Sequence, residues 1–357
     1  MRAMLVSFLL WTAWNRAPAA EPPRFTIAAV VGGRFVEGAP LTWADDHVRL
    51  LSRDGQLWDF SPSGAGNYRQ TSPDFKPYAA GELKERLEAE FGGRFEFQTT
   101  DHYVVGHPVG QGQVWPDRFE QMYAQFVEYF KVRGVSIRRP EFPLVATVFT
   151  DKDDFLHYCV EEGVALPQGA VGYYLPRTNR VAVLDIGAGK TTTSDWRHGA
   201  PTVVHEAAHQ VAFNLGIHNR FVLPPRWLSE GMGLLFEARG VWDANDYPDQ
   251  SHRINRARLR QFRQYLARRR PGAIQQLIAS DIRFEQDTLA AFAESWALTF
   301  YLTETEPASY AHFLSKTASH AAFAPYPAPQ RIADFTSTFG DNWTSLDAGF
   351  LKFMERL

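Results

Sequence analysis

The N-terminal quarter of the chain alternates short apolar runs with turn-forming residues, a pattern typical of β-strands. Phe25–Val31 is predicted to be a strand, and Gly32-Gly33 is predicted to be the turn that follows it. Two further runs, Val48–Arg53 and Gln56–Phe60, flank Asp54-Gly55, a dipeptide that favours a tight hairpin turn. This part of the chain is therefore expected to be all β.

Residues 21–80 are predicted to form one small β module. Ser61–Asn67 is rich in Gly and Ser and is expected to be a loop. Trp43, Trp58 and Phe60 are expected to lie in the core of the module. The alternative is that aromatic side chains are exposed there and bind a peptide or a glycan.

Beyond residue 81 helices and strands alternate. The expected elements are helices at 82–91 and 115–132, strands at 95–100 and 144–149, a helix from 152 that Asp151 caps, and a hairpin of 172–174 with 180–185. Phe119, Met122, Phe126 and Phe130 recur at helical spacing and indicate core packing rather than a cofactor site. Residues 81–357 are expected to form a second domain.

From residue 202 to the end the pattern is mainly helical. Helices are expected at 202–215, after Pro224-Pro225 as far as Phe236, and near 292–302, 308–317 and 344–357. Arg253–Arg270 holds eight arginines and no acidic residue. We interpret it as a solvated helix face that acidic residues elsewhere balance; an anion-binding face for nucleic acid, lipid headgroups or acidic glycans is the alternative.

The segment His205-Glu206-Ala207-Ala208-His209 carries the clearest chemistry of the chain. On a helix, His205 and His209 lie one turn apart on the same face, so their imidazoles converge on one point. A catalytic zinc ion takes three protein ligands and keeps one position open. Glu230, in Trp227-Leu-Ser-Glu230-Gly231, is the candidate for the third ligand. The pattern predicts a His2Glu site for one zinc ion.

These motifs resemble those of the gluzincin metallopeptidases, the superfamily of thermolysin and aminopeptidase N. The stretch Phe292–Leu302 is similar to a later helix of the aminopeptidase type. Residues from about 80 to the end are similar to the bacterial family called domain of unknown function 1570. The expected fold class is α+β: an SH3-like β module, then a gluzincin-type zinc domain with a mixed sheet and a mainly helical C-terminal half.

The resemblance implies a peptidase that acts on a peptide or protein substrate. Zinc lowers the pKa of bound water and polarises a carbonyl group, while Glu206 serves as general base and then as general acid. The hairpin that contains Tyr173 and Tyr174 is the expected place for an extended substrate backbone. Glu237 is either an orienting partner of a ligand histidine or a surface charge, and the surface charge is the favoured interpretation.

The group that would stabilise the oxyanion is not evident from the sequence. The resemblance implies a tyrosine where this chain has Phe292, which cannot donate a hydrogen bond. Tyr173, Tyr174, Tyr301 or a histidine such as His218 would have to substitute. The chain also lacks the Gly-x-Met-Glu-Asn motif that grips a substrate amine, so an endopeptidase is favoured over an aminopeptidase. The alternative function is a catalytically weak or inactive binding or scaffolding protein that keeps its zinc.

Composition, net charge and the N-terminal residues bear on the partners and the cellular location of the protein. A net charge of −3 over 357 residues predicts no strong attraction to nucleic acid or to membranes. Cys159 is the only cysteine and is expected to be a small buried side chain rather than a nucleophile. Residues 1–20 are typical of a signal peptide with cleavage near Ala19 or Ala20, so export to the periplasm or the medium is expected, without a transmembrane segment. The oligomeric state stays open.

Overall fold

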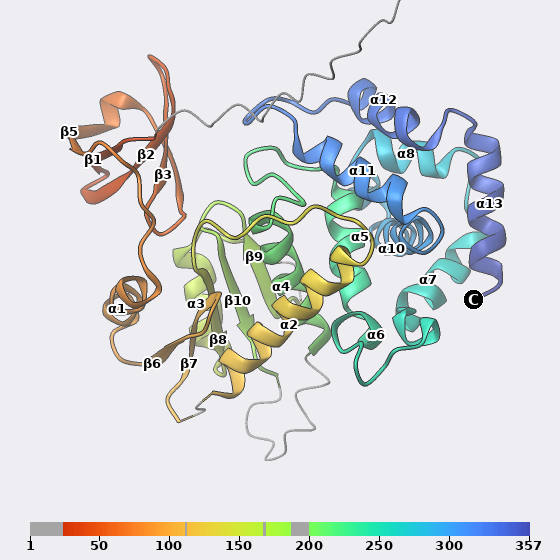
Figure 1. Cartoon of the computed structure of the whole chain (residues 1–357), viewed down its shortest axis with the longest axis horizontal. Helices are drawn as coiled ribbons and strands as arrows, with labels where there is room; N and C mark the ends of the chain where they lie inside the picture. Colours follow the sequence, from red (N-terminus) through yellow and green to blue (C-terminus); the bar gives the residue numbers. More distant parts are fainter. Residues whose placement is uncertain (1–23, 111–112, 167–168, 187–199) are drawn as a thin grey trace, which may run out of the picture. The chain divides into compact units, whose positions relative to one another are not determined.

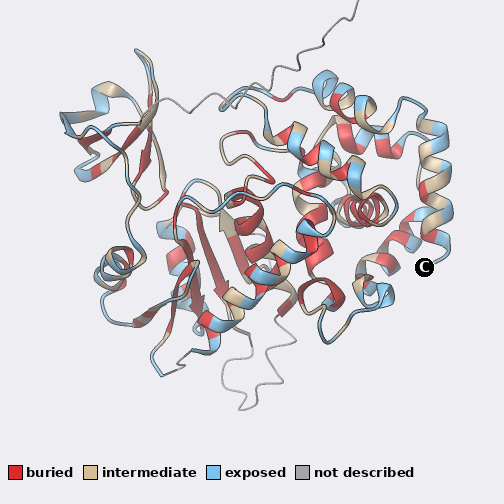
Figure 2. Cartoon of the chain, in the orientation of Figure 1, coloured by how far each residue is buried: buried red, intermediate tan, exposed pale blue. Residues whose placement is uncertain are grey.

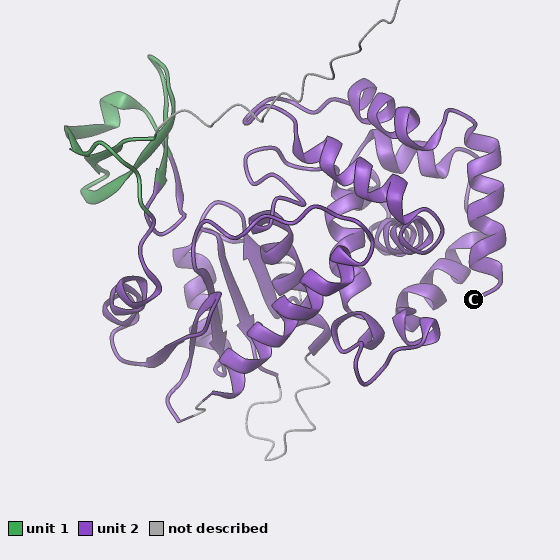
Figure 3. Cartoon of the chain, viewed as in Figure 1, with its two compact units in different colours: residues 1–51, 59–76 green, residues 52–58, 77–357 purple. Residues whose placement is uncertain are grey.

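The computed structural model describes residues 24–110, 113–166, 169–186 and 200–357. They divide into two compact units (Figure 3): a smaller one of residues 1–51 and 59–76, described from residue 24, and a larger one of residues 52–58 and 77–357. The expected signal peptide lies outside the described residues. The α+β architecture confirms the predicted fold class: an antiparallel β module precedes a mixed sheet and a mainly helical half (Figure 1).

The β module is a five-stranded sheet in the order β4-β3-β2-β1-β5. Its strands are β1 (Thr26–Val31), β2 (Arg34–Trp43), β3 (Val48–Ser52), β4 (Leu57–Phe60) and β5 (Ala65–Ser72). Gly32 and Gly33 join β1 to β2 at φ values of 55° and 81°, in the left-handed region that glycine adopts without strain. A meander whose last strand returns to pair with the first has the strand order of an SH3-like barrel.

Two expectations for this module are wrong. The segment Ser61–Asn67 is not all loop, because it contains a 3-10 turn at Pro62–Gly64 and the start of β5. Trp43 is 54% exposed and packs against Tyr68, with the ring centroids 5.2 Å apart. Aliphatic side chains fill the interior instead: Ile27, Ala28, Val36, Val48 and Leu50. Trp58 and Phe60 are half-buried, so none of the three aromatic residues lies fully in the core, and exposed Trp43 agrees with the alternative interpretation only in its exposure.

A five-stranded mixed sheet organises the first half of the larger unit. Its elements are α1 (Ala80–Phe91), β6 (Phe95–Thr99), β7 (Tyr103–Pro108), α2 (Val114–Lys131), β8 (Leu144–Phe149), α3 (Lys152–Glu161), β9 (Gly172–Leu175) and β10 (Arg180–Leu184). The order is β6-β7-β8-β10-β9, in which β7, β8 and β10 are parallel and both edge strands are antiparallel to their neighbours. The side chain of Asp151 caps α3 by accepting hydrogen bonds from two backbone N–H groups, as predicted.

Helices cover both faces of this sheet. Because side chains alternate along a strand, Val181 and Val183 pack into the cluster of α2 and α4 (Ala200–Asn214), whereas Ala182 packs with α1 and α3. The predicted stripe of α2 is buried, and Phe126 stacks on Phe236 with the centroids 4.7 Å apart. Burial raises the pKa of Cys159 on α3 to about 11, which suits a packing residue and not a nucleophile.

The rest of the larger unit is helical. Its further helices are α5 (Arg226–Phe236), α6 (Arg239–Trp242), α7 (Arg256–Leu266), α8 (Ala273–Ala279), α9 (Arg283–Gln286), α10 (Thr288–Thr305), α11 (Pro307–Ala318), α12 (Ala328–Phe339) and α13 (Trp343–Glu355), with a 3-10 turn η3 at Gln250–Arg253. The central helix α10 is buried on nearly all sides (Figure 2), and α5 packs directly against it. No helix within the described ranges is long and apolar enough to cross a membrane.

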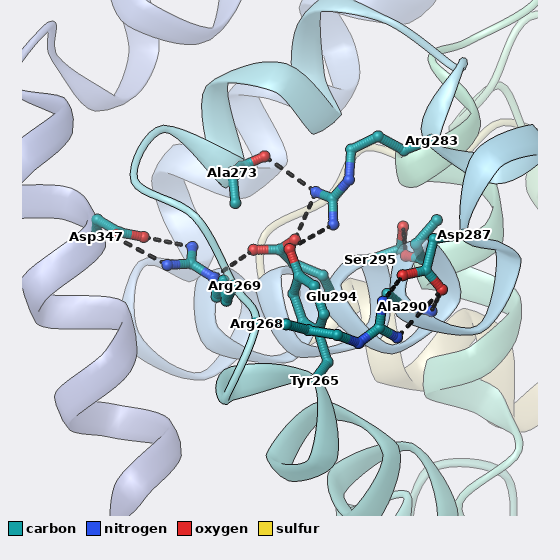
Figure 4. Close-up of polar contacts among 11 residues, drawn as sticks. Tyr265, Arg268, Arg269, Ala273, Arg283, Asp287, Ala290, Glu294, Ser295 and Asp347 are labelled. Atoms are coloured by element: carbon teal, nitrogen blue, oxygen red, sulfur yellow. Dashed lines mark hydrogen bonds and ion pairs between the residues drawn. The ribbon is translucent and has the colours of Figure 1, made fainter.

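Buried ion pairs hold this helical half together. Glu294 of α10 is fully buried and accepts hydrogen bonds from Arg269 at 2.7 Å and from Arg283 at 2.6 Å (Figure 4). On the same helix Glu304 binds Arg253 through both carboxylate oxygens, at 2.8 and 3.1 Å. The interpretation of the arginine-rich segment as a solvated face is therefore wrong for these arginines, although acidic residues do balance them.

Candidate metal centre

Three side chains from two helices converge where α4 packs against α5. His205 and His209 lie one turn apart on α4, and Glu230 reaches them from α5. The two Nε2 atoms are 3.1 Å apart, and Oε2 of Glu230 lies 3.4 Å from Nε2 of His205 and 3.9 Å from Nε2 of His209. The fold thus brings together the three residues of the predicted His2Glu group.

The spacing of these ligand atoms suits a tetrahedral cation. Bonds of about 2.0–2.1 Å at tetrahedral angles place ligand atoms roughly 3.3–3.4 Å from one another. The three observed separations, 3.1, 3.4 and 3.9 Å, lie on either side of that value. The side chains are 12%, 13% and 20% exposed, so the group is largely buried and still reaches solvent. Such a group could hold a metal ion and leave a position open.

Local sequence explains why α5 comes so near to α4. A Cβ atom on Gly233 would lie 2.7 Å from Cε1 and 2.8 Å from Nε2 of His205, so the position has room only for glycine. Pro225 precedes the helix and offers no capping side chain. Asp281 supplies the missing acceptor, since its Oδ1 receives the backbone N–H of Arg226 at 2.9 Å.

Glu237 belongs to the site. Its Oε1 lies 3.1 Å from Nδ1 of His205, and its Oε2 accepts a hydrogen bond from Nδ2 of Asn255 at 2.8 Å. Because Nδ1 of His205 can donate its hydrogen to this carboxylate, Nε2 keeps the lone pair that faces Glu230. The interpretation of Glu237 as a surface charge is therefore wrong, and the contact with His205 that the other interpretation expected is present.

Glu206 extends from α4 toward the edge strand β9. Its Oε2 accepts the backbone N–H of Tyr174 at 2.8 Å. Burial, together with the charge of Glu230, raises the pKa of Glu206 to about 7, even though the charge of His205 acts in the opposite direction. A carboxyl group that titrates near neutral pH can both take up and release a proton, as general acid–base catalysis requires.

The protonation states of two of the three residues, Glu230 and His209, suit cation binding. Burial lowers the pKa of His205, but contacts with Glu230 and Glu237 outweigh it and raise that pKa above its usual range, so a cation must displace a proton from His205. Burial raises the pKa of Glu230, but contacts with His205 and His209 outweigh it and bring the value to about 2. Burial and the neighbouring His205 lower the pKa of His209 to about 4. An ionised Glu230 and a neutral His209 are the states in which these groups bind a metal. The carboxylates of Glu230 and Glu237 contact the two ring nitrogens of His205 and favour a positive charge at the site.

Part of the chain around this site matches one family model. Residues 199–324 match the family model described as Protein of unknown function (DUF1570). This match is narrower than the resemblance expected from about residue 80 to the end. No curated protein matches the chain.

Two solved structures show weak similarity. One is a mutant of a two-domain M1 zinc metallopeptidase bound to L-arginine, with 14% identity and a TM-score of 0.38 over 73% of this chain and 52% of that chain. The other is a mutant M1 zinc metallopeptidase from Deinococcus radiodurans, with 13% identity and a TM-score of 0.37 over 71% of this chain and 50% of that chain. The chain spans about half the length of these structures.

The three tyrosines proposed as oxyanion donors make their contacts elsewhere. Tyr173 lies in the cluster of α1 and α3, on the sheet face opposite α4. The hydroxyl group of Tyr174 donates a hydrogen bond to Oδ1 of Asn179 at 3.0 Å. Tyr301 packs against Phe350 of α13, with the centroids 5.7 Å apart. Within the described residues none of these hydroxyl groups contacts the His2Glu group.

His218 and Phe292 lie nearer to the site. His218 is buried, and neither ring nitrogen has a hydrogen-bond partner among the described residues. Burial is the main cause that lowers the pKa of His218 to about 3. Phe292 lies between two guanidinium groups, whose carbon atoms are 5.9 Å (Arg226) and 5.7 Å (Arg258) from its ring centroid. Sequence reasoning did not identify Arg226 or Arg258 as site residues. Arg258 is one of many arginines in its segment, and Arg226 lies just before the Trp-Leu-x-Glu-Gly pattern and is not part of it.

Proposed function

We propose that the chain is a zinc-dependent hydrolase of peptide bonds, in which His205, His209 and Glu230 hold one zinc ion. The convergence of two imidazoles and a carboxylate at tetrahedral spacing is the observation that carries this proposal. Glu237 supports it, because it orients His205 as outer partners of zinc ligands do. A zinc ion bound there would lower the pKa of a water molecule and polarise a carbonyl group.

Glu206 is the proposed general base. It accepts a proton from the attacking water and later delivers that proton to the leaving amine nitrogen. The backbone N–H of Tyr174 holds one carboxylate oxygen of Glu206 and leaves the other for this exchange. A purely structural metal site would have no need of a carboxyl group with a pKa of about 7 beside its ligands.

The substrate is proposed to be an extended peptide cleaved within its chain. Among the described strands β9 is an edge strand of the mixed sheet and pairs only with β10. An edge of this kind can pair with an extended backbone. Export, with removal of residues 1–20, is part of the same proposal and rests on the sequence alone.

Hydrolysis of a mixed library of quenched peptides by the zinc-loaded protein tests this function. We expect cleavage by the wild type and none by Glu206→Gln, which keeps the shape of the side chain but cannot act as a base. The cleavage sites would define the specificity and separate endopeptidase from aminopeptidase activity. Equal cleavage by both proteins would refute the role of Glu206.

The second candidate is a catalytically weak or inactive binding protein that keeps zinc. It is favoured by one observation: no tyrosine hydroxyl contacts the His2Glu group within the described residues, and Phe292 cannot donate a hydrogen bond. One zinc ion in both the wild type and Glu206→Gln, with no cleavage by either, would support this candidate.

A further inference from the structure

Arg226 lies beside the candidate metal centre, where its guanidinium group forms a loose ion pair with Glu230. It is the first residue of α5 and lies one helical turn before Glu230, on the same face. Oε2 of Glu230 faces the histidines, whereas Oε1 lies 3.7 Å from Nε of Arg226. That distance is too long for a hydrogen bond. Among the described residues the guanidinium group makes no hydrogen bond, and the side chain is 45% exposed.

The surroundings nevertheless hold Arg226 in place. Its backbone N–H is bound by Asp281, and both carboxylate oxygens of Asp281 are in turn held by Arg331 at 3.0 Å. The guanidinium carbon lies 4.6 Å from the ring centroid of Phe284 and 5.9 Å from that of Phe292. Aromatic rings attract a guanidinium plane and leave the N–H groups at its rim free to donate.

We propose that Arg226 is the catalytic residue that stabilises the oxyanion, an inference that rests on the proposed peptidase function. As the water oxygen bonds to the carbonyl carbon, the π electron pair of the C=O bond moves onto the oxygen and Glu206 takes the water's proton. Arg226 donates hydrogen bonds to the resulting oxyanion. When the C–N bond breaks, the electron pair restores C=O, and the proton passes from Glu206 to the amine nitrogen. Arg226 stays protonated throughout.

Arg258, the other arginine beside Phe292, is less suited to this role. Its side chain is 22% exposed, and its Nη1 donates a hydrogen bond to Gln261 at 3.0 Å. Its Nη2 lies 3.6 Å from Oε1 of Glu237. These contacts make Arg258 a partner of Glu237, whereas the guanidinium group of Arg226 makes no hydrogen bond among the described residues.

The test compares Arg226→Met and Arg226→Lys with the wild type and with Arg260→Met. Arg260 is an exposed arginine of α7, so its replacement makes the same chemical change outside the site. Peptide hydrolysis, the dissociation constant for zinc and the affinity for a peptide phosphinate are measured on each protein. The phosphinate carries a tetrahedral, anionic centre like that of the transition state.

For Arg226→Met we expect kcat to fall about 10²–10³-fold with little change in KM, as when one oxyanion donor is removed. The affinity for the phosphinate should fall in parallel. The dissociation constant for zinc should stay within about threefold of the wild-type value, since Arg226 is not a ligand. Arg226→Lys should recover part of the loss, and Arg260→Met should match the wild type.

Each contrary result has a distinct meaning. If Arg226→Met cleaves peptides and binds the phosphinate as the wild type does, the inference is wrong and the peptidase proposal stands. If it loses zinc in proportion to activity, Arg226 acts by positioning Glu230, and the inference is again wrong. If the wild type holds zinc but cleaves nothing, the proposed function fails. The affinity for the phosphinate then tests the inference by itself. Weaker binding by Arg226→Met than by the wild type supports Arg226 as an oxyanion donor, whereas equal binding by the two proteins, or binding by neither, overturns it.

Discussion

Replacing Gly233 by alanine should damage the metal centre without touching a ligand. The new Cβ atom would lie 2.7 Å from Cε1 of His205, where an ordinary contact begins at 3.4 Å, so the ring or α5 must retreat by about 0.7 Å. His205 has little freedom to move, because Glu237 and Glu230 contact its two ring nitrogens. A misplacement beyond about 0.5 Å is enough to impair a preorganised site. We expect zinc affinity to fall about 10–100-fold and the metal-free protein to lose about 1–3 kcal/mol of stability.

Competition with a chelator of known zinc affinity, together with urea unfolding of the metal-free protein, measures both effects. Gly81→Ala is the matched control, because this helical glycine has no atom within 4 Å of the position of an added Cβ. The control should bind zinc as the wild type does and should not lose stability. Wild-type zinc affinity and unchanged stability in Gly233→Ala would refute the packing argument.

Three further substitutions test the surroundings of the site. Glu237→Gln should weaken zinc binding about 10–100-fold, because His205 loses its charged partner; unchanged affinity in a chelator competition would contradict this. Glu294→Gln should cost about 3–5 kcal/mol in urea unfolding, because Arg283 loses its carboxylate partner and Arg269 keeps only Asp347; a loss below about 1 kcal/mol would be inconsistent with the buried cluster. Burial raises the pKa of Glu304, but hydrogen bonding to Arg253 outweighs it and the net pKa is lowered. Its contribution to stability is therefore present above about pH 4.3, the usual glutamate pKa, and is lost as the pH falls further. Glu304→Gln should be less stable at pH 7 and should lose less stability than the wild type on acidification, as measured by unfolding at several pH values.

Local geometry explains which parts of the site could be predicted from the sequence. The convergence of His205 and His209 follows from the helical repeat alone, and the stripe of α2 follows from the same period. Asp151 could be predicted as a cap because the interaction spans only two or three residues.

Contacts between distant segments explain the errors. Glu237 lies within the site because Asn255, at the start of α7, binds it there, and no local pattern encodes that contact. Tyr173 and Tyr174 are adjacent in a strand, so their side chains lie on opposite faces, and the sheet register decides which of them faces α4. Trp43 is exposed because aliphatic residues from other strands already fill the interior of the module.

The proposed oxyanion donor, Arg226, also depends on contacts between distant segments. Phe292 stands where the resemblance to the aminopeptidases implies a tyrosine, and the arginines beside it come from α5 and α7. Their approach depends on how these helices pack around α10 and has no signature in residue spacing. For the same reason the acidic partners of the arginine-rich segment could not be identified before the fold was known.

The metal content of the purified protein tests the central claim most directly. We expect one zinc ion per chain in the wild type and in Glu206→Gln, and a loss of zinc affinity of at least about 10-fold when any one ligand is replaced, in His205→Asn, His209→Asn or Glu230→Gln. Binding measured by chelator competition, with unfolding curves to verify that each variant folds, gives this result without depending on any substrate. A folded wild-type protein that binds no zinc, or zinc binding unaffected by all three replacements, would contradict the account.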